Sequence, residues 1–105
     1  NSSNNLLIEV QVLGSTSSGT HYVAALFQDS TAGSLAAGWF TPVTTNTGGN
    51  VVFTHFMAAG TTSATTFKVR CGPSGAATFN FNGYAGARKL GSVGVSSITI
   101  TEISV

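Results

Sequence analysis

The stretch LLIEVQVL, residues 6–13, decides the fold of this chain. Its even-numbered positions from Ile8 to Val12 are all β-branched aliphatic residues, whereas Glu9 and Gln11 lie at odd-numbered positions between them. Successive side chains of a β-strand point to opposite faces, so this alternation places an apolar face against a core and a mixed face outside it. We therefore expect a strand over Leu6–Leu13.

The same alternation recurs along the rest of the chain, separated by polar runs that contain glycine. The segments that show it are His21–Gln28, Val51–Met57, Thr65–Cys71, Thr78–Asn82 and Val93–Val105. Leu35–Phe40 could be a short strand or an irregular passage before Pro42. The turn-like runs between them are Gly14–Gly19, Asp29–Gly33, Thr44–Asn50, Gly60–Ser63, Gly72–Gly75 and Gly83–Gly86. Within the last strand, Ile103 and Val105 take the opposite face from Ile98 and Ile100, so we expect either a bulge at Glu102 or an exit of the chain from the core there.

Turn-like runs that recur at short intervals along a chain without helical periodicity are typical of an all-β fold. We predict two packed antiparallel sheets, that is, a β-sandwich. A length of 105 residues suits one core, so residues 1–105 are expected to form a single domain. The polar start Asn1–Asn5 favours a domain cut from a longer protein.

The chain carries very little charge, and this excludes several classes of partner. Charged residues make up 7% of the sequence and the net charge is +1, which is too small to hold a nucleic-acid backbone. No apolar run reaches the length of a membrane span, so membrane insertion is not expected. A nearly neutral surface gives little repulsion between copies of the chain and favours an oligomer.

Two predicted strands, His21–Gln28 and Val51–Met57, are apolar on both faces. In so small a domain, such strands require a buried surface beyond a single core. We expect one face of each strand to lie near a subunit interface, and the pattern leaves open which face that is. Cys71 shares its face with Phe67 and Val69 and is expected to be a buried free thiol. The alternative is that it forms an interchain disulfide or is a reactive thiol.

The sequence offers few groups for catalysis. Among its three carboxylates, Glu9 and Glu102 could meet across neighbouring strands, but nothing supplies the other donors that an acid–base site needs. No strand–turn–helix nucleophile elbow accompanies Asp29 and the histidines. We therefore expect a protein that is not an enzyme and has no cofactor.

The two histidines, His21 and His55, share no short ligand spacing. With a single cysteine, the donor set for a structural zinc site within one chain is incomplete, so no metal is expected. We expect both side chains to be hydrogen-bonded locally. The alternative is that His21 or His55 meets its symmetry mates on a three-fold axis and binds an ion there.

Trp39 and Tyr84 are the best candidates for ligand binding, because an exposed ring stacks on the apolar face of a sugar with little loss of entropy. Arg88 and Lys89 follow Tyr84 closely and could hold an acidic glycan. The alternatives are that the aromatic residues pack in the core or an interface, and that the two cations are simply solvated.

Three stretches resemble the C-terminal domains of phage and prophage tail fibres and related tail proteins. They are NNLLIEVQV at residues 4–12, AGTTSATTFKVRCGPSGAATFNFNG at residues 59–83 and GSVGVSSITITEI at residues 91–103. The resemblance implies a jelly roll like those of the tumour necrosis factor and C1q families, usually a homotrimer at the distal end of an extracellular virion fibre. It implies adhesion to a host cell-surface glycan or protein, and it transfers no catalytic residues; only Ser63–Arg70 and Ser96–Ile103 carry over, as framework strands.

The leading hypothesis is thus a trimeric tip domain that adheres to a host surface without catalysis. A second hypothesis is a purely structural domain that trimerises and caps a fibre. A third is a carbohydrate-binding module of a secreted enzyme, which would present a planar row of exposed aromatic residues without forming an oligomer.

Overall fold

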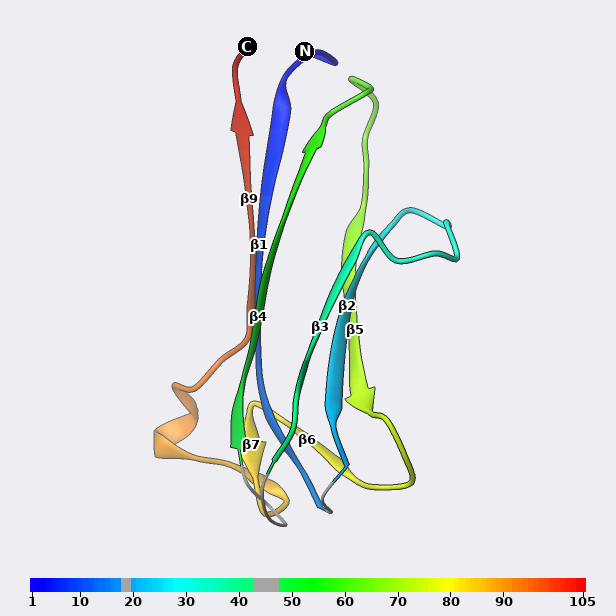
Figure 1. The fold of residues 1–105 in the computed structure, drawn as a ribbon. Helices are drawn as coiled ribbons and strands as arrows, with labels where there is room; N and C mark the ends of the chain where they lie inside the picture. Colours follow the sequence, from blue (N-terminus) through cyan, green and yellow to red (C-terminus); the bar gives the residue numbers. More distant parts are fainter. Residues whose placement is uncertain (18–19, 43–47) are drawn as a thin grey trace.

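The computed structural model describes residues 1–17, 20–42 and 48–105 (Figure 1). Its strands are β1 (Asn5–Thr16), β2 (Tyr22–Gln28), β3 (Ala36–Phe40), β4 (Gly48–Ala58), β5 (Phe67–Pro73), β6 (Phe79–Phe81), β7 (Gly83–Tyr84), β8 (Ala87–Arg88) and β9 (Ser97–Ile103). One short 3-10 turn, η1, spans Leu90–Ser92. Across the described ranges, no helix is long and apolar enough to cross a membrane.

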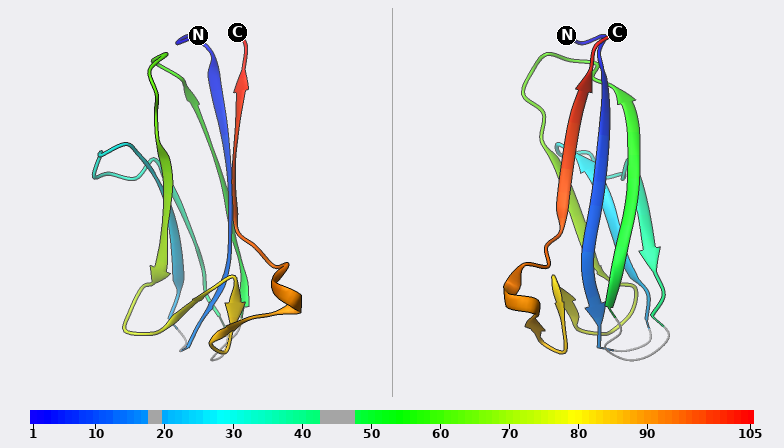
Figure 2. Two further views of the ribbon diagram at one scale, coloured as in Figure 1. Left: turned by 180° about the vertical axis from the view of Figure 1, so that it is seen from behind. Right: turned by 90° about the vertical axis from the view of Figure 1, so that its left-hand side faces the viewer.

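The strands form two main antiparallel sheets that face each other (Figure 2). In the first sheet β4 pairs with one edge of β1, while β9 and β6 pair with different parts of the other edge. The second sheet has the order β3-β2-β5, and β7 and β8 make a small separate hairpin. The predicted all-β antiparallel sandwich is confirmed, whereas the jelly-roll winding stays a prediction.

The core lies between the even-numbered faces of β1 and β2. Ile8, Val10 and Val12 of β1 are almost fully enclosed, as are the side chains of β2 that face them. Those side chains are Tyr22, Ala24 and Leu26. Burying a large aliphatic or aromatic side chain stabilises a fold by about 1.5–3 kcal/mol, so this small set supplies much of the driving force.

Two predicted turns are wrong at their edges, because glycines there belong to strands. β1 continues through Gly14 to Thr16, and β4 begins at Gly48 and pairs with this extension. A Cβ at Gly14 would lie 2.5 Å from Cζ of Phe79, so this glycine allows close packing inside a strand. The remaining parts of those predicted turns include residues 18–19 and 44–47, which lie outside the described residues.

β9 is regular over its whole length, so the bulge expected at Glu102 is wrong. It pairs with β1 without interruption from Ser97 to Ile103. The register places Ile98 opposite Val10 and therefore on the face toward the second sheet. Ile98 nevertheless stays 41% exposed, because the described second sheet ends at β5 and leaves this face partly uncovered.

Cys71 lies at the same uncovered side of the sandwich. It is opposite Ala24 and so shares the inward face with Val69, as predicted, but its side chain is exposed and the predicted burial is wrong. The reason is that β5 is the last strand of its sheet. Partial desolvation still raises the pKa of the Cys71 thiol.

We call this region the open side. It consists of Val69 and Cys71 of β5, Phe81 of β6, and Ile98 and Ile100 of β9. Three of these, Phe81, Ile98 and Ile100, are large apolar side chains that are 41–52% exposed. A monomer thus leaves part of its would-be core accessible to solvent.

The two ends of the sandwich differ. Both chain termini lie together at one end, whereas β6, β7, β8 and η1 gather at the other (Figures 1 and 2). This second end carries Tyr84, Arg88 and Lys89, three of the four residues predicted to bind a ligand.

Candidate functional site

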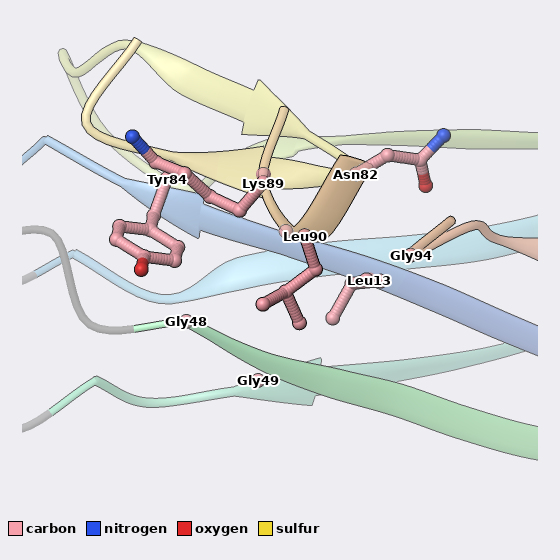
Figure 3. Close-up of a pocket in the computed structure, with 10 residues that line it drawn as sticks. Leu13, Gly48, Gly49, Asn82, Tyr84, Lys89, Leu90 and Gly94 are labelled. Atoms are coloured by element: carbon pink, nitrogen blue, oxygen red, sulfur yellow. The ribbon is translucent and has the colours of Figure 1, made fainter. Parts of the chain in front are cut away.

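A hollow of about 410 Å³ lies at the end of the sandwich opposite the termini (Figure 3). One side of it is made by β1 and β4, and the other by the β7–β8 hairpin and η1. Its side chains come mainly from Leu13, Tyr84, Lys89 and Leu90, and glycines supply most of the remaining lining. We call it the distal pocket.

The floor of the distal pocket is bare backbone. Gly14 and Gly49 are register partners on β1 and β4, and Gly48 precedes Gly49 on the same strand. Aromatic rings occupy the core side of Gly14 and Gly49: a Cβ at Gly49 would lie 2.7 Å from Cζ of Phe40, and Phe79 presses on Gly14 in the same way. Glycine at these two positions therefore admits the rings on the core face, and Gly48 adds no side chain to the opposite face.

The aromatic rings beneath the floor form one cluster. Tyr22 lies at its centre, with ring centroids 5.3 Å from both Phe40 and Phe79. Tilted pairs at this separation are favourable beyond the area that they bury. The floor is thus supported by a rigid part of the core.

The walls of the pocket are apolar and carry one cation. The Tyr84 ring and the Leu90 side chain both point toward the glycines of β4 (Figure 3). Tyr84 is 48% exposed, and Lys89 Nζ lies 4.8 Å from its ring centroid, a cation–π contact. This contact fixes the position of the ammonium group beside the ring.

The backbone of the hairpin is held in unusual conformations. Asn82, Ala85, Leu90 and Ser92 all have positive φ, with Leu90 at 54°. For a side chain such as leucine this conformation is uncommon and costs on the order of 1 kcal/mol, and such residues concentrate at functional sites. It places the Leu90 side chain, 85% exposed, at the mouth of the pocket rather than in the core.

Hydrogen bonds tie this hairpin to β1. The backbone amide of Leu13 donates to Ser96 Oγ at 2.9 Å, and Ser96 Oγ donates to Asn82 Oδ1 at 2.6 Å. Ser15 Oγ donates to the carbonyl of Gly83 at 3.1 Å. The pocket walls are therefore anchored to the same strand that forms the floor.

Of the four predicted binding residues, the fold brings together only Tyr84 and Lys89 in the distal pocket. Arg88 has a structural role, because its guanidinium donates to the carbonyls of Ser92 at 2.6 Å and Gly94 at 3.1 Å. Trp39 lies on the outer face of the second sheet, opposite Val23, and is 71% exposed. It does not line the distal pocket.

Sequence reasoning missed Leu13, Leu90 and the glycine floor. Alternation assigned Leu13 to the outer face of its strand but gave no indication of what would stand over it. The sequence pattern predicts that Gly14, Gly48 and Gly49 are turn residues, although Gly14 pairs with Gly49 and Gly48 pairs with Ser15 across strands. Only knowledge of the register could have revealed this floor.

The histidines and carboxylates do not converge. His21 Nδ1 lies 2.8 Å from Thr41 Oγ1, while His55 is half-buried opposite Ile8. Within the described residues, no three side chains among His, Cys, Asp and Glu come together as a metal site. A histidine on a three-fold axis stays a prediction.

The idea that Glu9 and Glu102 pair is excluded by strand register. Glu9 is opposite Thr99, whereas Glu102 is opposite Leu6, so the two carboxylates point to different faces of the first sheet. Glu102 instead accepts a hydrogen bond from Asn4 Nδ2 at 2.7 Å, and this bond is the main reason why its pKa lies below the usual range.

Comparisons with protein-family models, curated proteins and solved structures found no match to this chain. The resemblance to tail fibre domains accordingly stays a prediction, and any function must be argued from the site itself.

Proposed function

We propose that this domain is the non-enzymatic, trimeric tip of a phage tail fibre or a related extracellular fibre, and that it adheres to a host-surface glycan or protein. The observation that carries the proposal is the distal pocket, where an exposed aromatic ring, aliphatic side chains and a cation stand over an open backbone floor. Such a mixture suits binding and orientation of a ligand.

The size and place of the distal pocket support adhesion. Its volume of about 410 Å³ falls within the ~300–1,000 Å³ that is usual for ligand sites. The elements that line the pocket lie at the end of the sandwich opposite the termini (Figure 2). A segment that continues away from either terminus would therefore leave the pocket free to meet a surface.

The chemistry of the pocket favours binding without turnover. Tyr84 and Lys89 are its only titratable side chains among the lining residues. General acid–base catalysis needs a matched acid and base within reach of the same substrate. The three carboxylates all lie outside this lining, and two of them point to opposite faces of one sheet.

The open side supports self-association as part of this function. Ile98 and Ile100 face the second sheet but remain 41% and 46% exposed. Apolar surface of this kind is typically covered by another chain. We propose that trimer contacts cover it, which also favours the second candidate, a purely structural trimerisation and capping domain.

The third candidate, a carbohydrate-binding module of a secreted enzyme, has less support. Trp39 and Tyr84 belong to different sheets and cannot form the planar row of rings that this hypothesis requires.

Binding of the purified domain to whole cells and to glycan arrays tests the proposal. We expect Tyr84→Ala to weaken binding strongly while the melting temperature stays unchanged, because about half of the side chain is exposed and the ring lies outside the core. Trp39→Ala is the matched control, since it removes a more exposed ring from another face and should leave binding intact. If no cell or glycan is bound, the purely structural role replaces adhesion.

A further inference from the structure

We infer that the distal pocket selects saccharides that bear a carboxylate, such as uronic or nonulosonic acids. Lys89 pairs with the carboxylate, while Tyr84 and Leu90 receive the apolar face of the sugar ring. This inference rests on the proposed adhesion function and deepens it by naming the ligand class.

The first reason is that the charge of Lys89 is uncompensated. All three carboxylates of the chain lie in the described residues, and none is paired with Lys89. Glu102 contacts Asn4 and the N-terminal amine, and Asp29 accepts from the amide of Thr66 at 2.9 Å. Among the described residues, the ammonium group contacts only the Tyr84 ring, so a ligand anion meets no carboxylate there that competes for it.

The second reason is the positive electrostatic potential at this end of the sandwich. Arg88 lies next to Lys89 in the chain, and its guanidinium is bound only to the neutral carbonyls of Ser92 and Gly94. Its positive charge is therefore also unneutralised. Two cations beside a pocket without an acid attract anions and repel cations.

The third reason is that the remaining walls match a sugar ring better than a compact anion. Leu13, Leu90 and the Tyr84 ring offer apolar surface, and an aromatic face stacks well on the C–H face of a pyranose. The glycines of the floor add no side chains that would obstruct the approach of a ring. One end of the ligand is thus recognised by charge and the rest by stacking and apolar contact.

A single lysine favours a carboxylate over a phosphate. A phosphate monoester carries about −1.5 to −2 charges and is usually met by several donors or by a bidentate arginine. Here Arg88 is already engaged by two carbonyls, and Lys89 provides one point charge. The pocket therefore matches a monoanion.

Titration calorimetry with matched ligands tests this inference. The probes are an oligosaccharide that contains glucuronic acid, its neutral glucose counterpart of equal length, and glycerol phosphate. We expect the acidic sugar to bind about fivefold more tightly than the neutral one, as for a partly exposed ion pair. We expect this preference to shrink at ~1 M salt, because the Debye length falls to about 3 Å.

Variants assign the preference to one side chain. Lys89→Gln should lower the affinity for the acidic sugar to that of the neutral sugar, and Lys89→Arg should restore the preference. Lys68→Gln removes an equal charge from β5, away from the distal pocket, and should change nothing. Tyr84→Ala should weaken both sugars alike.

The outcomes separate this inference from the function on which it rests. Equal, Tyr84-dependent binding of acidic and neutral sugars would overturn the inference and leave adhesion standing. A preference for the acid that survives Lys89→Gln, or tighter binding of glycerol phosphate, would overturn it too. Failure to bind any saccharide, cell or cell-surface protein would remove the proposed function and the inference together.

Discussion

At the scale of single residues, Gly14 connects the fold to the site. It lies inside β1, where its missing side chain lets Phe79 approach from the core while its backbone forms part of the pocket floor. A methyl group there would also lie 2.9 Å from the carbonyl oxygen of Asn80, which is backbone and cannot rotate away. Both the packing and the pocket depend on this position.

Gly14→Ala should therefore destabilise the domain by about 1–3 kcal/mol, as expected for overpacking a core. The measurement is the free energy of unfolding from urea denaturation. Gly33→Ala is the matched control, because a Cβ at Gly33 meets nothing within 4 Å. Equal stability of the two variants would show that Phe79 does not press on Gly14.

Tyr22 is the residue whose ionisation is most strongly linked to folding. Its side chain is fully enclosed, and burial raises its pKa to about 12, an effect that the nearby backbone of Gly49 offsets only in part. The folded state thus holds the phenol proton more tightly than the unfolded state, whose pKa is about 10. The resulting stability is complete below pH 10 and is lost as the pH rises through about 12.

Tyr22→Phe should remove this component of the alkaline unfolding. Near pH 7 we expect the variant to stay within about 1 kcal/mol of the original, because the hydroxyl has no close hydrogen-bonding partner among the described residues. Between pH 10 and 12 the variant should become the more stable protein. The measurement is the melting temperature of both proteins over this pH range. If both proteins lose stability in parallel, Tyr22 is not the group whose ionisation causes this part of the alkaline unfolding.

At the scale of elements, the β7–β8 hairpin and η1 depend on Arg88. Its guanidinium joins the carbonyls of Ser92 and Gly94, which flank Val93 at the end of η1. Charge-assisted hydrogen bonds are stronger than neutral ones, and the planar guanidinium can serve two acceptors at once. Arg88 thereby positions Lys89 and Leu90 without lining the pocket.

Arg88→Ala should weaken ligand binding without unfolding the sandwich. We expect faster amide hydrogen exchange across residues 89–95 and an unchanged rate in β1 and β4, measured by mass spectrometry. Arg70→Ala removes another guanidinium, the one stacked 5.1 Å from the Phe27 ring on the second sheet, and should leave the hairpin unaffected. Unchanged exchange in Arg88→Ala would refute its role as a support.

Some features of the strands could be predicted from the sequence, and others could not. Alternation correctly placed Ile8, Val10 and Val12 in the core, because side-chain parity is a local property of a strand. The same alternation gave wrong predictions for Gly14 and Cys71. Whether an aromatic ring or solvent covers an inward-facing position depends on the opposing strands, which a local pattern does not reveal. The same limit applies to the site. Tyr84 and Lys89 are close in sequence, so their proximity in space could be predicted, but only the strand register shows that Trp39 lies elsewhere.

At the scale of the whole molecule, the open side is an apolar surface that a single chain does not cover. Ile100 lies opposite Ile8, a core residue, yet it is 46% exposed. Replacing it with a charged residue should cost little in a monomer, because the position already contacts water. The same change should be costly wherever another chain packs against it.

Ile100→Asp should therefore give a folded monomer, as judged by circular dichroism and size-exclusion chromatography. Val52→Asp is the control, because Val52 is 65% exposed on the outer face of the first sheet. We expect that variant to keep the original oligomeric state. If Val52→Asp separates the subunits and Ile100→Asp does not, the interface lies on the outer face instead.

We propose that this domain works as a trimeric tip with its distal pocket turned outward. Sedimentation equilibrium of the purified domain at micromolar concentration tests this proposal. We expect a mass three times the 10.6 kDa of one chain. A species of 10.6 kDa under these conditions would contradict it, because the open side would then be exposed in the working molecule.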